Sequence, residues 1–240
     1  MRNDGVSGRE AGFKADTSLD SYYISTLQDS FHETTDNVVL FVLGTVVLAG
    51  CPLPPSAIAT LTGLQRAQVQ GVLQSLQLFL TQPEGPDSPV QFLHKTFSDF
   101  VTDATRCTDL RFYIPPDDHT ELFHHCLNLM DKSLVKNMFS IPKYTLNSEV
   151  EDPLKKIEES GIRGALEYAC RSWHTHLIAA TGQTARIIPI LRRFLERKFL
   201  FWLEVFSYTN TVDDAIRALK TTVERLREVR PDWLLGFQVS

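Results

Sequence analysis

Hydrophobic residues recur along most of this chain at the spacing that places them on one face of an α-helix. Near the N-terminus this spacing is shared by Leu19, Tyr22, Tyr23 and Leu27. It predicts a linking helix within residues 17–35. Residues 38–49 are apolar around the whole circumference of a helix rather than on one face. The valines of that segment also suit a strand, but its length favours a helix that is buried on every side.

Two strand candidates follow a group of predicted helices in the first half of the chain. In order, the pattern predicts helices over 38–49, 57–62 and 66–77, strands over 78–81 and 90–93, and a helix over 95–102. The turn between the strands is rich in proline, as turns often are. This order is typical of a winged-helix domain, a three-helix core with a small β-hairpin, over residues 36–105. A helical bundle with a chance hairpin is the alternative interpretation.

After Pro115 and Pro116 the pattern changes to one helix after another. Helices are predicted from Leu122 onward and over 153–159, 165–179, 184–198, 201–208 and 212–229, with a polar loop over 142–152. No fixed repeat length is found, so a regular solenoid is not expected. The predicted fold class is mainly α, with a flexible tail over residues 1–16, the linking helix, the winged-helix domain and an all-α helical array over residues 106–240.

Composition narrows the possible functions. The chain of 240 residues is 43% hydrophobic, which is enough for a packed core. Its net charge of −5 and its scattered Lys and Arg residues argue against nucleic-acid binding. No apolar run reaches about 18 residues, so no membrane-spanning helix is expected. The four cysteines are widely spaced and form no CxxC pair, which suits a reduced, cytoplasmic setting.

Motifs for catalysis and metal binding are weak. The sequence contains no phosphate-binding GxxxxGK(S/T) loop, no GxSxG and no HExxH. The neighbouring residues His124 and His125 point to different faces of a helix, and His174 and His176 diverge by about 200°. Capping or helix-surface roles are therefore expected for His124 and His125, and a structural role for the thiol of Cys170. Neither a metal site nor a catalytic site is predicted.

One segment combines a core pattern with an exposed polar residue. Phe97 and Phe100 are three positions apart on one face of the predicted helix 95–102, so they belong in the core. His94 lies at the junction between the second predicted strand and this helix. Such junctions expose side chains and free N–H groups, which suits recognition of an anion. Capping of the helix by His94 is the alternative.

The same segment resembles a known motif. Its residues are Phe92, His94, Thr96, Phe97, Asp99 and Phe100. They resemble the winged-helix motif that follows the NACHT nucleotide-binding domain in STAND-type signalling ATPases. The similarity is greatest to large fungal NACHT proteins, in which serine is usual at the position of Thr96. Weaker similarities occur at residues 42–49, 52–58, 73–76, 126–130, 166–177 and 200–205, so that the resemblance spans residues 17–225.

The resemblance implies a nucleotide-controlled switch. In that family the NACHT domain binds and hydrolyses ATP, and the winged helix folds against it in the ADP state. A histidine at the position of His94 contacts the β-phosphate of ADP, and the helical region that follows transmits the change to sensor repeats. Because this chain has no phosphate loop, the resemblance implies a fragment, a truncated gene product or a degraded paralogue. ADP or ATP is expected only beside a NACHT-type domain in cis or in trans, and the isolated chain is expected to hold no cofactor.

Three functions compete on these grounds. The first is a non-catalytic regulatory or interaction module of a fungal NLR-like protein, in innate immunity or incompatibility signalling. Its expected partners are a NACHT-type domain and other proteins, without a membrane or a specific nucleic acid. The second is a winged-helix DNA-binding protein, but the candidate recognition helix over 65–77 carries one cation, Arg66, and phosphate contacts dominate DNA affinity. The third is an enzyme that uses His94 and Asp99, but no nucleophile accompanies them.

Overall fold

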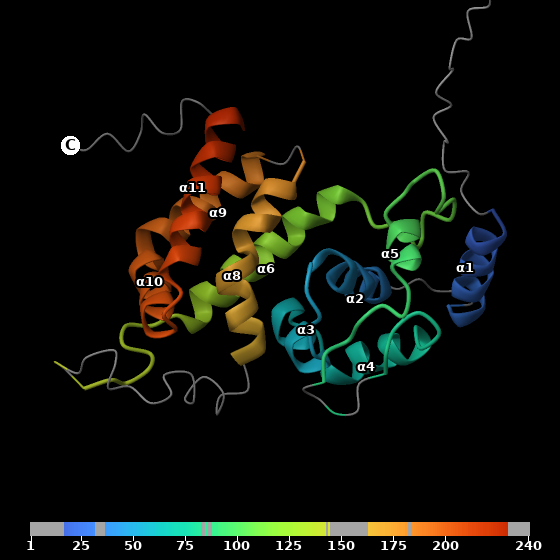
Figure 1. Ribbon diagram of the computed structural model, residues 1–240, viewed down its shortest axis with the longest axis horizontal. Coiled ribbons are helices and arrows are strands. Elements are labelled where there is room, and N and C mark those ends of the chain that lie inside the picture. The colour runs from blue at the N-terminus through green and yellow to red at the C-terminus, as the bar shows by residue number, and fades with distance from the viewer. Residues whose placement is uncertain are drawn as a thin grey trace, which may run out of the picture.

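The computed structural model describes residues 17–31, 37–82, 85, 88–142, 144, 163–181 and 184–229. In this part of the chain the protein is mainly helical, as the sequence predicts (Figure 1). The elements are α1 (Thr17–Ser30), α2 (Asn37–Leu48), α3 (Pro55–Thr62), α4 (Arg66–Ser75), α5 (Lys95–Val101), the 3-10 helix η1 (Pro116–Asp118), α6 (His119–Ser133), α8 (Arg163–Ala179), α9 (Thr184–Arg197), α10 (Phe199–Tyr208) and α11 (Val212–Val229). None of these helices is long and apolar enough to cross a membrane.

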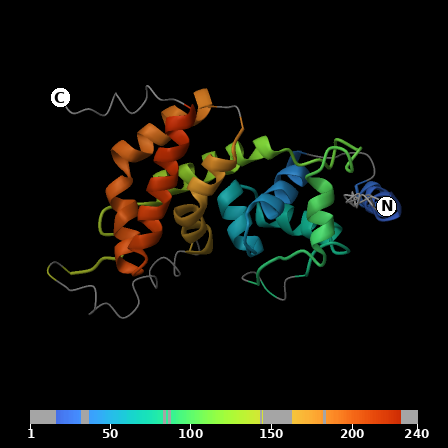
Figure 2. The same cartoon turned by 45° about the horizontal axis from the view of Figure 1, so that its top comes forward.

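Two groups of helices share one long helix. Helices α1 to α5 lie on one side of the molecule and α8 to α11 on the other, and α6 runs from the first group into the second (Figures 1 and 2). Helix α6 packs along α8 and against α9, while α3 packs against both α6 and α8. As a result, the buried hydrophobic residues of the two groups form one connected core.

Sequence signals at the helix ends agree with the observed α3 and α4. Pro55 occupies the first turn of α3, where its missing N–H is tolerated. Gly63 follows α3 in the left-handed conformation, with φ of 75°, and its N–H bonds to the carbonyl of Ala59. In α4 the buried residues include Val69 and Leu73, which the helical spacing assigns to the core. The helices predicted over 57–62 and 66–77 are thus confirmed, although α3 begins two residues earlier than predicted and α4 ends two residues earlier.

The predicted β-hairpin does not form: the described residues contain no strand. Two isolated bridges take its place, one between Leu80 and Phe92 and the other between Leu53 and Val90. The hairpin prediction is therefore wrong, although the two predicted strand segments do lie beside each other.

The reason lies in the end of α4. Residues 76–79 continue the helix as a turn, in which the N–H groups of Phe79 and Leu80 bond to the carbonyl of Leu76 at 2.9 and 3.0 Å. All three side chains are buried. Their spacing of three and four residues suits a helical turn, and it leaves too little extended backbone for a strand.

Helix α1 buries a different face from the predicted one. Tyr23 and Leu27 are buried as predicted, but Tyr22 is 52% exposed and Asp20 is buried instead. Asp20, Tyr23 and Leu27 share a helical face because they are separated by three and four positions. The carboxylate of Asp20 is tolerated in the interior because Arg106 pairs with it at 2.7 Å.

Helix α2 is buried on one side only, whereas the sequence predicts burial on every side. Its buried residues are Val39, Val42, Leu43, Gly44 and Thr45. On the other side, Leu40, Phe41 and Leu48 are half-buried at the molecular surface. This outer side of α2 is therefore apolar and in partial contact with solvent.

The C-terminal helices agree with their predicted boundaries to within about two residues, the usual uncertainty of a helix end. Their core contains Trp173 and Trp202, which meet edge to face with ring centres 5.9 Å apart. Trp202 also donates its indole N–H to the carbonyl of Cys170 at 3.0 Å. The tail predicted over 1–16 and the helix predicted over 153–159 lie outside the described residues, as do residues 32–36 and most of the loop predicted over 142–152.

Candidate functional site

His94 immediately precedes α5, and its backbone is extended, with φ of −140° and ψ of 131°. Its side chain is exposed and makes no capping hydrogen bond to the helix. The capping alternative is therefore wrong, and the prediction that His94 points outward is confirmed. Phe97 and Phe100 are buried, also as predicted.

Aromatic rings hold α5 in place from its buried side. Phe97 stacks in parallel on Phe79 with ring centres 4.1 Å apart, and it meets Tyr23 edge to face at 5.3 Å. Phe100 lies 5.3 Å from Tyr23. Such pairs contribute about 0.5–1.5 kcal/mol beyond the burial of their surfaces. The start of α5, with His94, is thus attached to a packed cluster.

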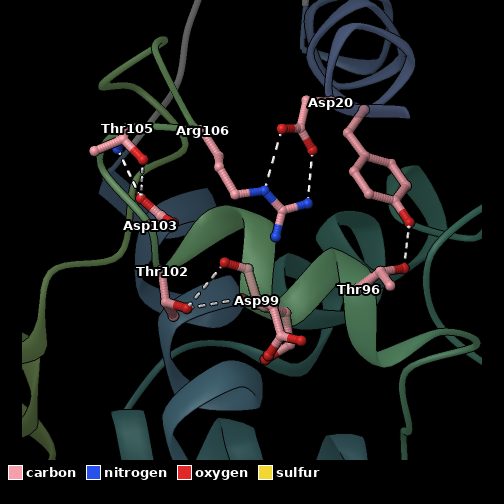
Figure 3. Close-up of polar contacts among 9 residues, drawn as sticks. Asp20, Thr96, Asp99, Thr102, Asp103, Thr105 and Arg106 are labelled. Atoms are coloured by element: carbon pink, nitrogen blue, oxygen red, sulfur yellow. Dashed lines mark hydrogen bonds and ion pairs between the residues drawn. The ribbon is translucent and has the colours of Figure 1, made fainter. Parts of the chain in front are cut away.

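Two polar contacts tie α1 to this cluster (Figure 3). The hydroxyl groups of Tyr23 and Thr96 lie 2.8 Å apart, and Arg106 donates two hydrogen bonds to Asp20, at 2.7 and 3.1 Å. These hydrogen bonds to Asp20 raise the pKa of the Arg106 guanidinium, and the charge of Asp99 adds to the rise. Thr96, where serine is usual in the resembling motif, therefore has a structural partner on α1.

A hollow of about 320 Å³ opens between α2 and the start of α5. We call it the α5 hollow; its lining includes Val46, Val47, Pro52, Gln91, Phe92, Lys95 and Ser98. Lys95 and Ser98 share a face of α5 because they are three positions apart, and the exposed His94 directly precedes Lys95. The ammonium group of Lys95 and the hydroxyl of Ser98 thus line the hollow, and the exposed imidazole of His94 precedes them in the chain. Each of these groups can donate a hydrogen bond to an anion such as phosphate. Lys95 and Ser98 were not predicted, although their position next to His94 was visible in the sequence.

The same region shows no activated nucleophile. Cys51 lines the α5 hollow, but burial raises the pKa of its thiol, which favours the less reactive protonated form. Asp99 lies more than one turn along α5 from His94, and its charge is one of several that raise the pKa of Arg106. The structure therefore does not assemble His94 and Asp99 into a catalytic pair.

Helix α4, all of which the structure describes, has no basic face. Its exposed residues are Arg66, Ala67, Gln68, Gln70, Gly71 and Gln74. Because binding to the DNA backbone depends on several cations, this helix offers little to a DNA-binding function.

A chain of polar groups joins the two helix groups, and the sequence did not predict it; Tyr168 and His176 are buried and His119 is half-buried. Tyr168 of α8 donates a hydrogen bond to the carbonyl of Ala49 at 3.3 Å. Its oxygen can then accept the Nε2 proton of His176, 2.6 Å away. Nδ1 of His176 lies 2.7 Å from Nδ1 of His119, so the tautomers that satisfy the whole chain have His119 as donor and His176 as acceptor.

Burial keeps this histidine pair uncharged. It lowers the pKa of His176 to about 3, with the charge of His119 as a further cause, and it lowers the pKa of His119 as well. The described residues contain no group of three His, Cys, Asp or Glu side chains that could hold a metal ion. The network connects the end of α2 to α6 and α8, so its role is to hold these helices together.

None of the family models, curated proteins or solved structures that were compared with the chain matches it. The fold itself defines only a broad class, a mainly helical protein in which α6 joins two groups of helices. The similarity to the region that follows a NACHT domain accordingly stays a resemblance of motifs, and function has to be inferred from the residues of this chain.

Proposed function

We propose that this chain is a non-catalytic, cytoplasmic regulatory and interaction module that contacts the phosphate of a nucleotide held by a NACHT-type domain. The observation that carries the proposal is the exposed imidazole of His94 at the anchored start of α5. The resemblance of residues 92–100 to the motif that follows NACHT domains supports the same role. The parent protein is then a fungal NLR-like ATPase of immunity or incompatibility signalling, and the NACHT-type domain acts in cis or in trans.

In this proposal, α2, α3 and α4 are the three-helix core of a winged-helix domain. The three helices pack on one another, and the bridges Leu53–Val90 and Leu80–Phe92 hold the following segment beside them. In place of a β-hairpin wing, the structure has two isolated bridges. The segment that contains them connects the end of α4 to the start of α5.

Side chains, rather than the helix dipole, have to carry phosphate recognition here, because α5 is only seven residues long. The imidazole of His94 can donate a hydrogen bond in its neutral and in its protonated form. Lys95 adds a positive charge beside it. Losing one such bond costs about 1–3 kcal/mol, which shifts a balanced two-state switch about 5- to 150-fold.

The test compares His94→Ala with His94→Asn and Lys220→Ala in a full-length NACHT protein that carries this region. Asn keeps a hydrogen-bond donor, and Lys220 is exposed on the remote α11. We expect ADP to leave the Ala variant about 5- to 150-fold faster, the Asn variant less so, and the Lys220 variant at the normal rate. Melting of the isolated chain with His94→Ala should stay within about 0.5 kcal/mol of the parent.

Two results contradict the proposal. One is unchanged ADP release together with a loss of several kcal/mol in the isolated chain, which makes His94 a structural residue. The other is ATP hydrolysis by the pure isolated chain that a point mutation in it abolishes, since the sequence supplies no phosphate loop.

A further inference from the structure

The outer side of α2 borders an apolar groove. This α2–α6 groove has a volume of about 590 Å³ and lies between α2, Leu64 beyond the end of α3, and the start of α6. Phe41, Leu48 and Leu122 are among its apolar lining residues. On one wall the ring of Phe41 lies 4.7 Å from that of His125. The groove is independent of His94 and of the α5 hollow, which lie on other surfaces of the same helix group.

The sequence of α2 is more hydrophobic than its partial burial among the described residues would require. Its twelve residues, NVVLFVLGTVVL, include no charged side chain. A helix at the surface of a protein usually presents polar or charged residues to solvent, and a helix that is apolar all round is usually buried. Leu40, Phe41 and Leu48 nevertheless reach the surface along the groove. A concave, mainly apolar surface of this volume with a few polar groups at its edge is typical of a binding site.

One wall of the groove is acidic. Asp118 and Glu121 line it at the start of α6. Glu121 pairs with Arg186 at 2.8 Å, but no cation among the described residues pairs with Asp118. Burial raises the pKa of Asp118, and the neighbouring charges of Asp117 and Glu121 raise it further. A half-buried carboxylate in such surroundings is stabilised by a positive charge brought from outside.

We infer that the α2–α6 groove binds an amphipathic helix of another protein, with apolar residues against α2 and a Lys or Arg that reaches Asp118. The groove follows α2 from Asn37 to Leu48, a length of about 16 Å at 1.5 Å per residue. That length accommodates three turns of a helix, with anchors at positions i, i+3, i+4 and i+7. Asp118 lies close to Gly44, near the middle of α2, so the cation belongs near the middle of the partner helix.

The first experiment selects binders from a displayed library of 14-residue helical peptides against the immobilised full chain. We expect the selected peptides to share an apolar i, i+3, i+4, i+7 stripe with Lys or Arg near its middle. The same selection against Asp118→Lys should enrich Asp or Glu at that position instead. Reversal of the preferred charge is a result that a non-specific apolar surface cannot give.

The second experiment measures the affinity of one selected Lys-bearing peptide by fluorescence anisotropy. Asp118→Asn should weaken binding about tenfold, the effect expected for loss of one partly buried charge pair. Leu48→Glu and Leu64→Glu, on two walls of the groove, should abolish it. Leu78→Glu is the matched control, because Leu78 is also exposed but lies outside the groove. Thermal melting of each variant establishes that it is folded.

Four outcomes overturn the inference. The selection can yield no apolar helical peptide, or the preferred charge can stay the same with Asp118→Lys. Binding can survive in folded Leu48→Glu and Leu64→Glu variants. Finally, the chain can form a concentration-dependent dimer that Leu48→Glu disrupts, in which case the occupant is a second copy of this chain. None of these results touches the ADP-release test of His94, so the two proposals can fail separately.

Discussion

The two helix groups present different surfaces to solvent. In the C-terminal group, α9 and α11 expose charged residues, and ion pairs such as Arg192–Glu196 at 2.8 Å and Arg217–Asp214 at 3.2 Å join neighbouring turns. In the N-terminal group, α2 has no charge at all and borders an open apolar groove. Exposed ion pairs add little stability. The difference in surface charge between the two groups therefore matters mainly for binding to other molecules. The N-terminal group is the half to which we assign the proposed partner.

The two groups also differ in what holds them together. The C-terminal core is a cluster of large aromatic residues around Trp173 and Trp202. In the N-terminal group, α1 is held by polar contacts at its edge as well as by rings, through Asp20 and Tyr23. Substitutions should therefore cost most in the C-terminal core and progressively less toward the edges of the N-terminal group.

The largest effect is expected for Trp202→Ala. The substitution removes a fully buried ring and leaves the carbonyl of Cys170 without its indole donor. The free energy of unfolding should fall by about 3–5 kcal/mol. Urea denaturation measures it, with Leu200→Ala as the control on the same helix, since Leu200 is 73% exposed. A similar loss in both variants means that the aromatic cluster does not dominate this group.

A smaller loss of stability, which appears only as the pH falls, is expected from His176, where the two helix groups meet. The pKa of His176 is lowered by burial to about 3 from its usual 6.5. Between these values the unfolded chain binds a proton that the folded chain does not, so stability falls as the pH drops below 6.5. His176 alone should contribute a loss of about 2 kcal/mol between pH 7 and pH 5.

His176→Gln tests this, because Gln keeps a donor toward Tyr168 but does not titrate. The variant should lose about 2 kcal/mol less than the parent protein between pH 7 and pH 5, as measured by urea denaturation at both values. Half-buried His174, whose pKa is also lowered, remains in both proteins, whereas half-buried His119 contacts His176 directly, so the comparison measures the titration of the histidine pair. An equal pH dependence in the two proteins rules out the neutral buried state of His176.

The contrast between the groups also decides what the sequence could predict. The bounds of α8 to α11 follow from apolar residues spaced at helical intervals, which is information local to each helix. The outward side chain of His94 and the burial of Phe97 and Phe100 were predictable for the same reason. By contrast, the ion pair Asp20–Arg106 joins residues 86 positions apart. No local sequence pattern predicts a contact over that separation.

Where local patterns support two structures, tertiary packing decides between them. Residues 78–81 suit a strand by composition, yet Leu76, Phe79 and Leu80 bury together in a helical turn. The contact between half-buried His119 and buried His176 was missed because each histidine, considered on its own helix, looks like a solitary residue. Nothing in the sequence places the two rings in contact, which needs the packing of α6 on α8.

A still smaller loss of stability is expected for Tyr23→Phe, which removes one of the polar contacts that hold α1. Tyr23→Phe keeps the ring in its aromatic cluster and removes only the hydrogen bond to Thr96. The cost should be about 1 kcal/mol. Tyr22→Phe is the matched control, because Tyr22 neighbours it on the exposed side of α1, and it should cost nothing measurable. A loss above about 3 kcal/mol for Tyr23→Phe means that α1 is bound more tightly than one polar contact explains.

The smallest change in stability is expected for Gly44→Ala in α2, and this substitution should stabilise the chain rather than destabilise it. Gly44 lies inside the helix, where glycine costs about 0.5–1 kcal/mol relative to alanine. A Cβ at this position meets the side chain of Ile114 at 3.7 Å and that of Asp118 at 3.8 Å, both ordinary contacts. Gly44→Ala should therefore stabilise the chain by about 0.5–1 kcal/mol. Gly71→Ala in α4, where a Cβ meets nothing within 4 Å, should stabilise it equally. If Gly44→Ala destabilises the chain while Gly71→Ala stabilises it, there is less free space at this wall of the α2–α6 groove than the contact distances indicate. The contrast between the groove-lined α2 and the charged surface of α9 and α11 is then weakened.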